Sequence, residues 1–87
     1  MSSLQGEIVT TYKDLTNVFG KPTYGPDMTN NKSTCEWVIE FEDGTKGYIY
    51  DWKEEKTIYG KYNWHIGGTS SNVVDKIYEL LIMIFHN

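Results

Sequence analysis

The sequence predicts a small α+β protein in which a three-stranded antiparallel meander carries a short N-terminal helix and a longer C-terminal helix. Two segments place apolar residues at helical spacing, and one segment alternates between apolar and polar residues. An Asp-Gly pair follows that alternating segment, as is typical of a hairpin turn. The predicted order is therefore α-β-β-β-α in a single domain spanning residues 1–87, with both helices on one face of the sheet.

The first predicted helix spans Tyr12–Phe19. Thr11 is a favourable N-cap residue, and Asp14 completes an imperfect capping box because Asp is shorter than Glu or Gln. Gly20 can end the helix in a left-handed conformation. A helix of about two turns is not stable alone, so its apolar side must dock on another element. We expect residues 1–6, which are small and polar, to form a loose chain end.

A polar segment from Lys21 to Thr34 is rich in turn-forming residues and is predicted to be a loop. Long loops in compact domains are often functional. Tyr24 is the one large ring in this loop, and an exposed ring there could close over a ligand. The alternative, that Tyr24 packs on the base of its own loop, stays open.

The alternating segment Glu36–Glu42 is predicted to be a half-exposed strand, and Asp43-Gly44 turns it back into a second strand, Thr45–Trp52. A two-residue turn would place Tyr50 opposite Trp37 and build one aromatic face. A three-residue turn with a bulge, which would instead pair Glu42 with Lys46, is the alternative. Of the two registers we expect the first.

The connection Lys53–Lys61 leads to a third predicted strand, Tyr62–Ile66, in which Trp64 alternates with His65. Side chains that alternate along a strand point to opposite faces. We therefore expect Trp64 to join Tyr50 on the inner aromatic face and His65 to point outward.

The second predicted helix spans Asn72–Phe85, after Gly67-Gly68 has ended the third strand. Residues 69–72, which lie between the two glycines and the body of the helix, are all good N-cap residues. The apolar stripe of this helix is wide, and its last turn and a half is apolar nearly all round. A surface of that kind usually marks an interface. We therefore expect a homo-oligomer that forms through the C-terminal helix.

Composition limits the classes of partner. The net charge is −4, and all eight positive residues are Lys. Affinity for long DNA or RNA comes mainly from neutralised phosphates, so we expect no nucleic-acid polymer as partner. A small nucleotide needs only two or three well-placed donors. The single Cys35 cannot form an internal disulfide. Without a signal peptide or a long apolar run, the sequence predicts a cytoplasmic protein with no membrane partner.

The candidate ligand site comes from two short stretches. Trp52 is the ring that a small core would leave over for stacking, and Lys53 supplies a cation beside it. The Gly67–Ser70 turn could hold a phosphate through backbone N–H groups and hydroxyls, although it matches neither a Walker loop nor GxGxxG. Two glycines before a helix are more often only a turn, and a lone outward His is most often ordinary surface. The predicted ligand-binding residues are Tyr24, Trp52, Lys53, Trp64, His65, Gly67, Gly68, Thr69 and Ser70.

We expect no enzymatic activity, no metal ion and no cofactor. Catalysis by His65 would need a nucleophile or a second acid beside it, and no Ser or Cys motif offers a nucleophile. Cys35, His65 and His86 lack the spacing of metal ligands. The carboxylates of Glu36, Glu40 and Glu42 lie on one face of the alternating strand and are best explained as solvated surface.

Several short segments together resemble a widespread family of small phage-encoded proteins, which we connect to the anti-CBASS sponges. The segments are Phe19–Gly25, Glu36-Trp37, Phe41–Gly44, Ile49–Lys53 and Trp64–Gly68. The resemblance covers about Tyr12 to Ile77 and assigns no ligand contact to a position. It implies an oligomeric, non-enzymatic binder that sequesters a cyclic oligonucleotide such as cyclic GMP-AMP. It also implies a phage protein that acts in the bacterial cytoplasm and keeps effectors inactive.

A second function class stays open beside the nucleotide sponge. The negative charge also fits a small phage inhibitor that binds a host protein directly through an acidic strand face. A co-purified nucleotide would favour the sponge, and a stoichiometric protein partner would favour the inhibitor.

Overall fold

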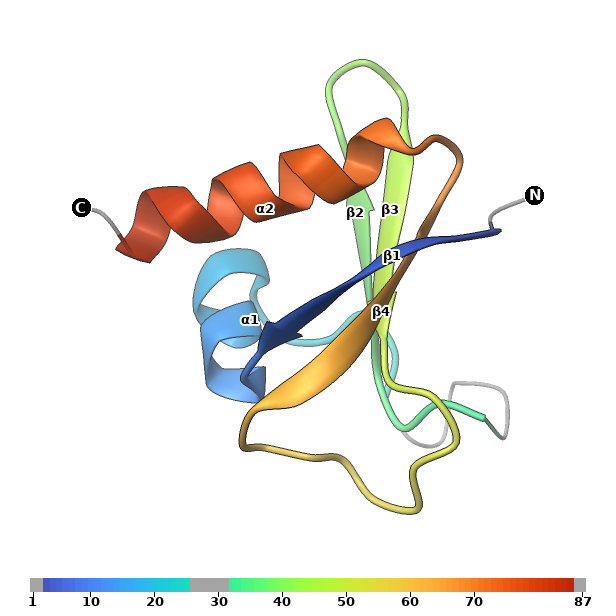
Figure 1. Ribbon diagram of the computed structural model, residues 1–87, viewed down its shortest axis with the longest axis vertical. Helices are drawn as coiled ribbons and strands as arrows, with labels where there is room; N and C mark the ends of the chain where they lie inside the picture. Colours follow the sequence, from blue (N-terminus) through green and yellow to red (C-terminus); the bar gives the residue numbers. More distant parts are fainter. Residues whose placement is uncertain (1–2, 26–31, 86–87) are drawn as a thin grey trace.

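The computed structural model describes residues 3–25 and 32–85, so part of the predicted polar loop, residues 26–31, lies outside the described residues, as does His86. Two helices and four strands follow in the order β1-α1-β2-β3-β4-α2 (Figure 1). Their bounds are β1 Ser3–Thr10, α1 Tyr12–Phe19, β2 Glu36–Glu40, β3 Lys46–Tyr50, β4 Tyr62–Gly68 and α2 Asn72–Phe85. The predicted α+β class and both helices are confirmed, but the sheet has four strands instead of three.

The extra strand, β1, lies where a loose chain end was expected, so that prediction was wrong for residues 3–6. β1 pairs antiparallel with β4, from Ser3 opposite Gly68 to Thr10 opposite Tyr62. Its pairing partner is more than fifty residues away in the sequence, and local turn chemistry carries no signal of such a contact. Ile8 points into the core and is 5% exposed. Burial of one face of β1 therefore stabilises this strand, although its first residues are small and polar.

The sheet order is β1-β4-β3-β2, and all neighbouring strands are antiparallel. The predicted meander of three strands is present as β2-β3-β4, and β1 is added along β4. Helix α2 packs against β1, β3 and β4, and α1 packs against α2 (Figure 1). Both helices therefore cover the same face, as predicted, and leave the opposite face without a helix among the described residues.

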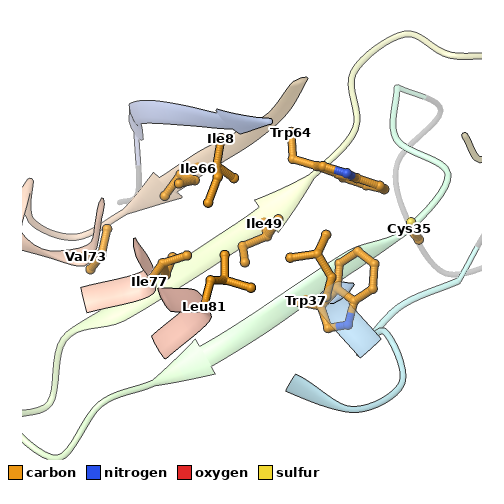
Figure 2. Packing of buried hydrophobic residues seen from close by; sticks show 10 residues of the cluster. Ile8, Cys35, Trp37, Ile49, Trp64, Ile66, Val73, Ile77 and Leu81 are labelled. Carbon is orange, nitrogen blue, oxygen red and sulfur yellow. The ribbon is translucent and has the colours of Figure 1, made fainter. Parts of the chain in front are cut away.

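The core lies between this covered face and the two helices (Figure 2). Trp37 of β2 and Trp64 of β4 meet edge to face, with ring centroids 5.4 Å apart. The helices contribute Leu15 from α1 and the apolar stripe of α2. The fully buried or nearly buried apolar residues are Ile8, Leu15, Cys35, Trp37, Ile49, Trp64, Ile66, Val73, Ile77 and Leu81.

The ends of α1 follow from its caps. The Thr11 hydroxyl oxygen accepts a hydrogen bond from the Asp14 N–H at 3.1 Å, as the imperfect capping box predicts. At the other end, the Gly20 N–H donates to the Thr16 carbonyl at 2.9 Å. The Gly20 carbonyl then accepts a hydrogen bond from the Trp37 indole at 2.9 Å, which joins the helix end to the core.

The β2-β3 register differs from both registers considered from the sequence. Phe41 donates to the Thr45 carbonyl at 2.9 Å, so the loop has three residues, and Gly44 occupies its left-handed position with φ 87°. Trp37 consequently lies opposite Ile49, and Tyr50 lies opposite Glu36. The expected pairing of Tyr50 with Trp37 was therefore wrong. Tyr50 points away from the core, and Ile49 takes its place.

Helix α2 buries one side and exposes the other. Val73, Ile77 and Leu81 face the sheet, whereas Ile82 and Met83 are exposed. With 14 residues the helix is shorter than the roughly 20 that a membrane span needs. No helix in the described part of the chain combines the length and apolar character that would let it cross a bilayer.

Replacing Gly68 by Ala is expected to destabilise the fold where α2 approaches the sheet most closely. An added Cβ would lie 2.5 Å from Val73 Cγ2 and 2.9 Å from the Lys46 carbonyl oxygen. Overpacking of this kind lowers the free energy of unfolding by about 1–3 kcal/mol. Urea denaturation measures the change. Gly60→Ala is the matched control, because nothing lies within 4 Å of its added Cβ; equal unfolding midpoints for the two variants would contradict this packing.

Candidate functional site

The candidate site is the sheet face that the described helices leave uncovered, which we call the open face. Side chains alternate along each strand, so the neighbours of the buried residues Ile49 and Trp64 point to this face. The open face carries Leu4, Glu7, Glu36, Val38, Glu40, Tyr48, Tyr50, Asn63 and His65. A solvent-facing antiparallel sheet surface is normally polar, whereas the middle of this one is aromatic and apolar.

One row of paired residues crosses the open face from β1 to the edge beyond β2. Glu7 lies opposite His65, His65 opposite Tyr50, and Tyr50 opposite Glu36. The row continues to Tyr24, which forms a β-bridge with Glu36. Directly opposite residues in antiparallel strands share a face and interact. The row therefore has the rings of Tyr50 and His65 in its middle, a carboxylate on each side of this pair, and the ring of Tyr24 at its end.

Three rings form what we call the ring cluster: Tyr50, Trp52 and His65. The Tyr50 and His65 rings stack, with centroids 5.5 Å apart and planes 19° apart. Trp52 lies 6.2 Å from Tyr50 and 6.4 Å from His65, measured between ring centroids. The Trp52 N–H donates to the Tyr62 hydroxyl at 3.2 Å, which fixes the backbone that presents the indole. Trp52 remains 36% exposed, so its ring is available to a ligand.

A pocket of about 330 Å³ opens at the ring cluster and is lined by Leu4, Tyr50, Trp52 and His65. Its volume lies at the lower end of the range typical of small-molecule sites, about 300–1,000 Å³. The walls are rings and a leucine side chain, which suit a flat, largely apolar group. Leu4 reaches the pocket from β1, so the strand that the sequence did not predict forms one wall.

Two lysines lie beside the indole of Trp52. The ammonium of Lys32 is 5.4 Å and that of Lys53 is 5.9 Å from the ring centroid. The Lys53 N–H also donates to the Lys32 carbonyl at 2.6 Å, which holds the two segments together. Lys53 has φ 58°, a left-handed conformation that is costly for a residue with a side chain. The fold thus retains a strained lysine at the edge of the ring cluster.

The predicted site residues separate into groups. Trp52, Lys53 and His65 do lie together, as the sequence analysis predicted. Trp64, also predicted as a ligand contact, is 0% exposed in the core, because it lies opposite Ile8 on the covered face. In this structure it has no surface to offer a ligand.

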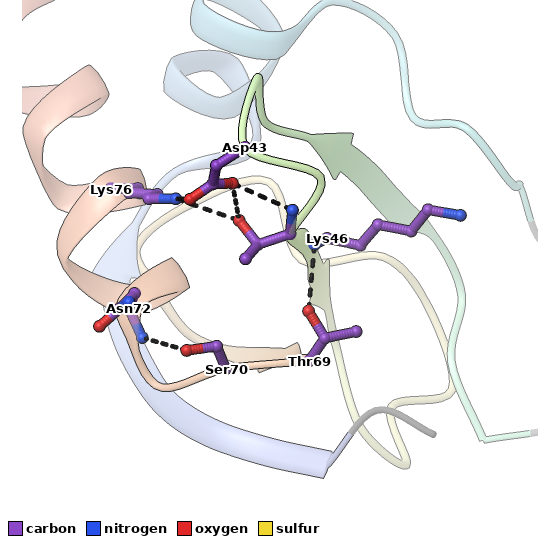
Figure 3. Close-up of polar contacts among 7 residues, drawn as sticks. Asp43, Lys46, Thr69, Ser70, Asn72 and Lys76 are labelled. Atoms are coloured by element: carbon purple, nitrogen blue, oxygen red, sulfur yellow. Dashed lines mark hydrogen bonds and ion pairs between the residues drawn. The ribbon is translucent and has the colours of Figure 1, made fainter.

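The Gly67–Ser70 turn is not part of the ring cluster. It lies at the far end of β4, where Gly67 is about 7 Å and Thr69 about 13 Å along the chain from His65 at roughly 3.3 Å per residue. Its polar groups bond within the protein. Thr69 N–H donates to the Lys46 carbonyl at 3.2 Å. The Thr69 hydroxyl oxygen accepts from the Lys46 N–H at 3.3 Å (Figure 3). The Ser70 hydroxyl oxygen accepts from the Asn72 N–H at 3.3 Å. The turn therefore caps α2 and joins it to β3.

Tyr24 lies at the β2 edge, where its N–H and carbonyl each form a 3.0 Å hydrogen bond with the backbone of Glu36. It is 41% exposed. Tyr24 is therefore held in an extended backbone beside the sheet, on the open face. It lies three strand positions from His65, with Glu36 and Tyr50 between them.

Three residues of the open face were missed as site residues: Leu4, Tyr50 and Glu36. Leu4 was assigned to a loose end, Tyr50 to the core and Glu36 to solvated surface. The β2-β3 register is the signal that would have found the second and third of them. A three-residue turn with Phe41 opposite Thr45 places Tyr50 on the face opposite Trp37 and directly across from Glu36, which alternation along β2 already places on that face.

A buried polar cluster lies behind the ring cluster, on the covered side. The carboxylate of Asp51 is 0% exposed and accepts hydrogen bonds from the Thr34 N–H at 2.7 Å, the Thr34 hydroxyl at 2.5 Å and the Cys35 N–H at 3.4 Å. The Thr34 and Thr57 hydroxyls lie 2.7 Å apart. These bonds join the end of the polar loop to the end of β3, next to Trp52. Among the described residues, no group of three or more His, Cys, Asp and Glu side chains is arranged to hold a metal ion.

The thiol of Cys35 is expected to resist reagents in the folded protein. Its side chain is 3% exposed, and burial, followed by the nearby Asp51 carboxylate, raises the pKa of the thiol to about 11. At pH 8 almost no thiolate is present, and thiolate is the reactive form. Labelling by Ellman's reagent should be slow in buffer, complete in concentrated urea, and faster as the pH approaches 11. Rapid stoichiometric labelling of the folded protein at pH 8 would show that this burial is wrong.

Comparisons with known proteins give no relative to which this chain can be assigned. No protein-family model matches the chain, and no curated protein or solved structure matches it significantly. The chemistry of the open face is therefore argued from its own residues: a flat apolar pocket, three clustered rings and two neighbouring cations.

Proposed function

We propose that this protein binds a cyclic oligonucleotide on the open face and sequesters it without hydrolysis. The observation that carries the proposal is the ring cluster with two lysines at its edge. A nucleotide presents a flat base and an anionic phosphate close together, and the pocket presents rings and ammonium groups in the same arrangement. The resemblance to phage sponge proteins points to the same class of ligand.

Base stacking supplies the first half of the interaction. Stacking of a base on an aromatic side chain contributes about 1–3 kcal/mol in proteins that bind single strands. Trp52 has the largest exposed ring of the cluster, and Tyr50 and His65 are already stacked beside it. Since these rings are held by the sheet, little side-chain freedom is lost when a base arrives.

Phosphate binding supplies the second half. Lys32 and Lys53 bring two positive charges to the Trp52 edge of the pocket. The rest of the open face carries the acids Glu7, Glu36 and Glu40, and the chain has a net charge of −4. Such a surface repels a long polyanion, whereas a ligand with one or two phosphates meets only the local cations. The charge pattern therefore favours a small nucleotide.

Binding without hydrolysis is supported by the groups that line the pocket. Tyr50 is the one hydroxyl-bearing side chain among the four lining residues, and burial together with the Glu36 charge raises the pKa of its phenol. A phenol with a raised pKa stays protonated near neutral pH and is a poor nucleophile. The thiol of Cys35 lies on the covered side of the sheet and is buried.

The setting proposed for this activity is the cytoplasm of a bacterium infected by a phage. There the protein would lower the concentration of a free cyclic signal, for example cyclic GMP-AMP, and prevent activation of the effector. Slow release of the ligand matters more for this role than any chemical step, because affinity differences arise mainly from dissociation rates.

Native mass spectrometry of protein purified from bacteria that make cyclic dinucleotides tests the proposal. We expect a complex with cyclic GMP-AMP, from which the intact ligand is recovered after denaturation. No binding of any cyclic dinucleotide or trinucleotide would contradict the proposed function. Recovery of linear products would instead indicate a hydrolase that uses His65.

Direct inhibition of a host protein is the second candidate function. The observation that favours it is the placement of Glu7, Glu36 and Glu40 on one uncovered face, which gives a surface suited to a basic partner. A stoichiometric host protein retained in place of a nucleotide, and released by high salt, would support this candidate.

The proposed assembly is a homo-oligomer that forms through α2. Ile82 and Met83 are exposed on α2, and Tyr78 is exposed at the flank of the helix, where its hydroxyl donates to the Glu7 carbonyl of β1. A contiguous exposed apolar surface commonly marks an interface. A second copy that covers these residues would also enlarge the small core of an 87-residue chain.

Replacing Trp52 by Leu is expected to weaken binding of cyclic GMP-AMP about tenfold to a hundredfold, because one stacked ring is lost. Isothermal titration calorimetry measures the change. Tyr59→Leu is the matched control, since Tyr59 is a more exposed ring, at 67%, outside the ring cluster. Similar losses in both variants would argue against a specific role for Trp52.

Replacing Ile82 by Glu is expected to dissociate the oligomer, because it places a charge within the exposed apolar side of α2. Light scattering coupled to size-exclusion chromatography measures the mass of each variant. Asn17→Glu introduces the same charge at an exposed position on α1 and should leave the mass unchanged. A wild-type protein that is monomeric throughout the micromolar range would contradict the proposed assembly.

A further inference from the structure

Glu36 has an environment that an ordinary surface carboxylate does not have. It lies on the open face but is only half-exposed. The described residues offer its carboxylate no ion pair and no hydrogen bond. A half-buried charge without a partner is unfavourable for the fold, so its retention here calls for an explanation.

Rings lie on both sides of Glu36. Its backbone N–H and carbonyl bond to Tyr24, so its pairing with Tyr50 is of the non-hydrogen-bonded type. In such a pair the Cα atoms are about 4.5 Å apart and the side chains are close. The carboxylate thus adjoins the ring cluster through Tyr50 and has the exposed ring of Tyr24 on its other side.

The electrostatics of this neighbourhood agree with the geometry. Burial raises the pKa of the Glu36 carboxyl, and the Glu36 charge contributes to the raised pKa of the Tyr50 phenol. The burial disfavours the charged carboxylate in the ligand-free protein. Hydrogen-bond donors from a ligand would stabilise that charge and remove the penalty.

We propose that Glu36 recognises a guanine-type ring by accepting two parallel N–H bonds from its edge. This inference rests on the proposed nucleotide-binding function and adds base specificity to the same site. The ring would stack against Tyr50, on the side of the ring cluster that faces β2, with its donor edge toward the carboxylate.

Hydrogen-bond complementarity selects guanine among the common bases. Guanine presents an imide N–H and an amino group side by side, which match the two oxygens of a carboxylate. The corresponding edges of adenine and cytosine place a ring-nitrogen acceptor beside the amino group, and that acceptor would repel a carboxylate. Uracil flanks its single N–H with two carbonyl oxygens. A guanidinium group also offers two parallel donors, but Lys32 and Lys53 would repel its charge.

Calorimetry with three mononucleotides tests the proposal. Guanosine monophosphate should bind about tenfold to a hundredfold more tightly than inosine monophosphate, which lacks the amino group, and adenosine monophosphate should bind no better than inosine monophosphate. Glu36→Gln should remove most of the preference for guanosine over inosine, because an amide offers only one acceptor oxygen. The preference is a ratio within one variant, so it reports specificity separately from folding.

Glu40→Gln is the matched control. Glu40 lies on the same strand and the same face, is exposed, and pairs with Lys46 outside the ring cluster. It should keep the preference for guanosine. Equal affinity for the three nucleotides, or an unchanged preference in Glu36→Gln, would overturn the role of Glu36 while leaving nucleotide binding intact. Binding of argininamide as tight as that of guanosine monophosphate would also overturn it. Absence of binding to these nucleotides and to cyclic GMP-AMP alike would remove the proposed function itself.

Discussion

The register between β2 and β3 decides what the open face contains. The three-residue turn pairs Trp37 with Ile49, so Ile49 enters the core and Tyr50 points to solvent. The same alternation sends Asp51 to the covered side and Trp52 to the open face. A slip of one residue exchanges the two faces of a strand, and here it would place Tyr50 inside and Ile49 outside. The ring cluster exists because this single register places Tyr50 and Trp52 on the same face as His65.

Burial of Asp51 connects the core to the site. A buried carboxylate is costly unless hydrogen bonds stabilise it, and the N–H groups of Thr34 and Cys35 together with the Thr34 hydroxyl do so. These bonds fix the end of the polar loop against the end of β3. Lys32 and Lys53 flank the bonded residues and are joined through their backbones at 2.6 Å. The cations beside Trp52 are therefore positioned by a buried network on the other side of the sheet.

The sequence predicted the elements better than the contacts between them. Caps and local periodicity are local signals, and both helices begin and end where they were predicted. β1 was not predicted because its strand partner, β4, is distant in the chain. The register was not predicted because an Asp-Gly turn is compatible with loops of two or three residues. Trp52, Lys53 and His65 were recognised as site residues by residue type, whereas Leu4, Tyr50 and Glu36 required the pairing of strands.

The open face differs from an ordinary solvated sheet surface, because its apolar, positively charged and acidic side chains occupy separate regions. Its apolar side chains cluster around one pocket, the ammonium groups of Lys32 and Lys53 lie at the Trp52 edge, and the half-buried carboxylate of Glu36 lies across Tyr50 on β2. A flat ligand bound over these rings would meet positive charge at one end and a hydrogen-bond acceptor at the other. A nucleotide has the matching polarity, with phosphate at one end and base N–H donors at the other. Reversal of such a ligand would bring its phosphate against Glu36, so the charges would allow one orientation and disfavour the other.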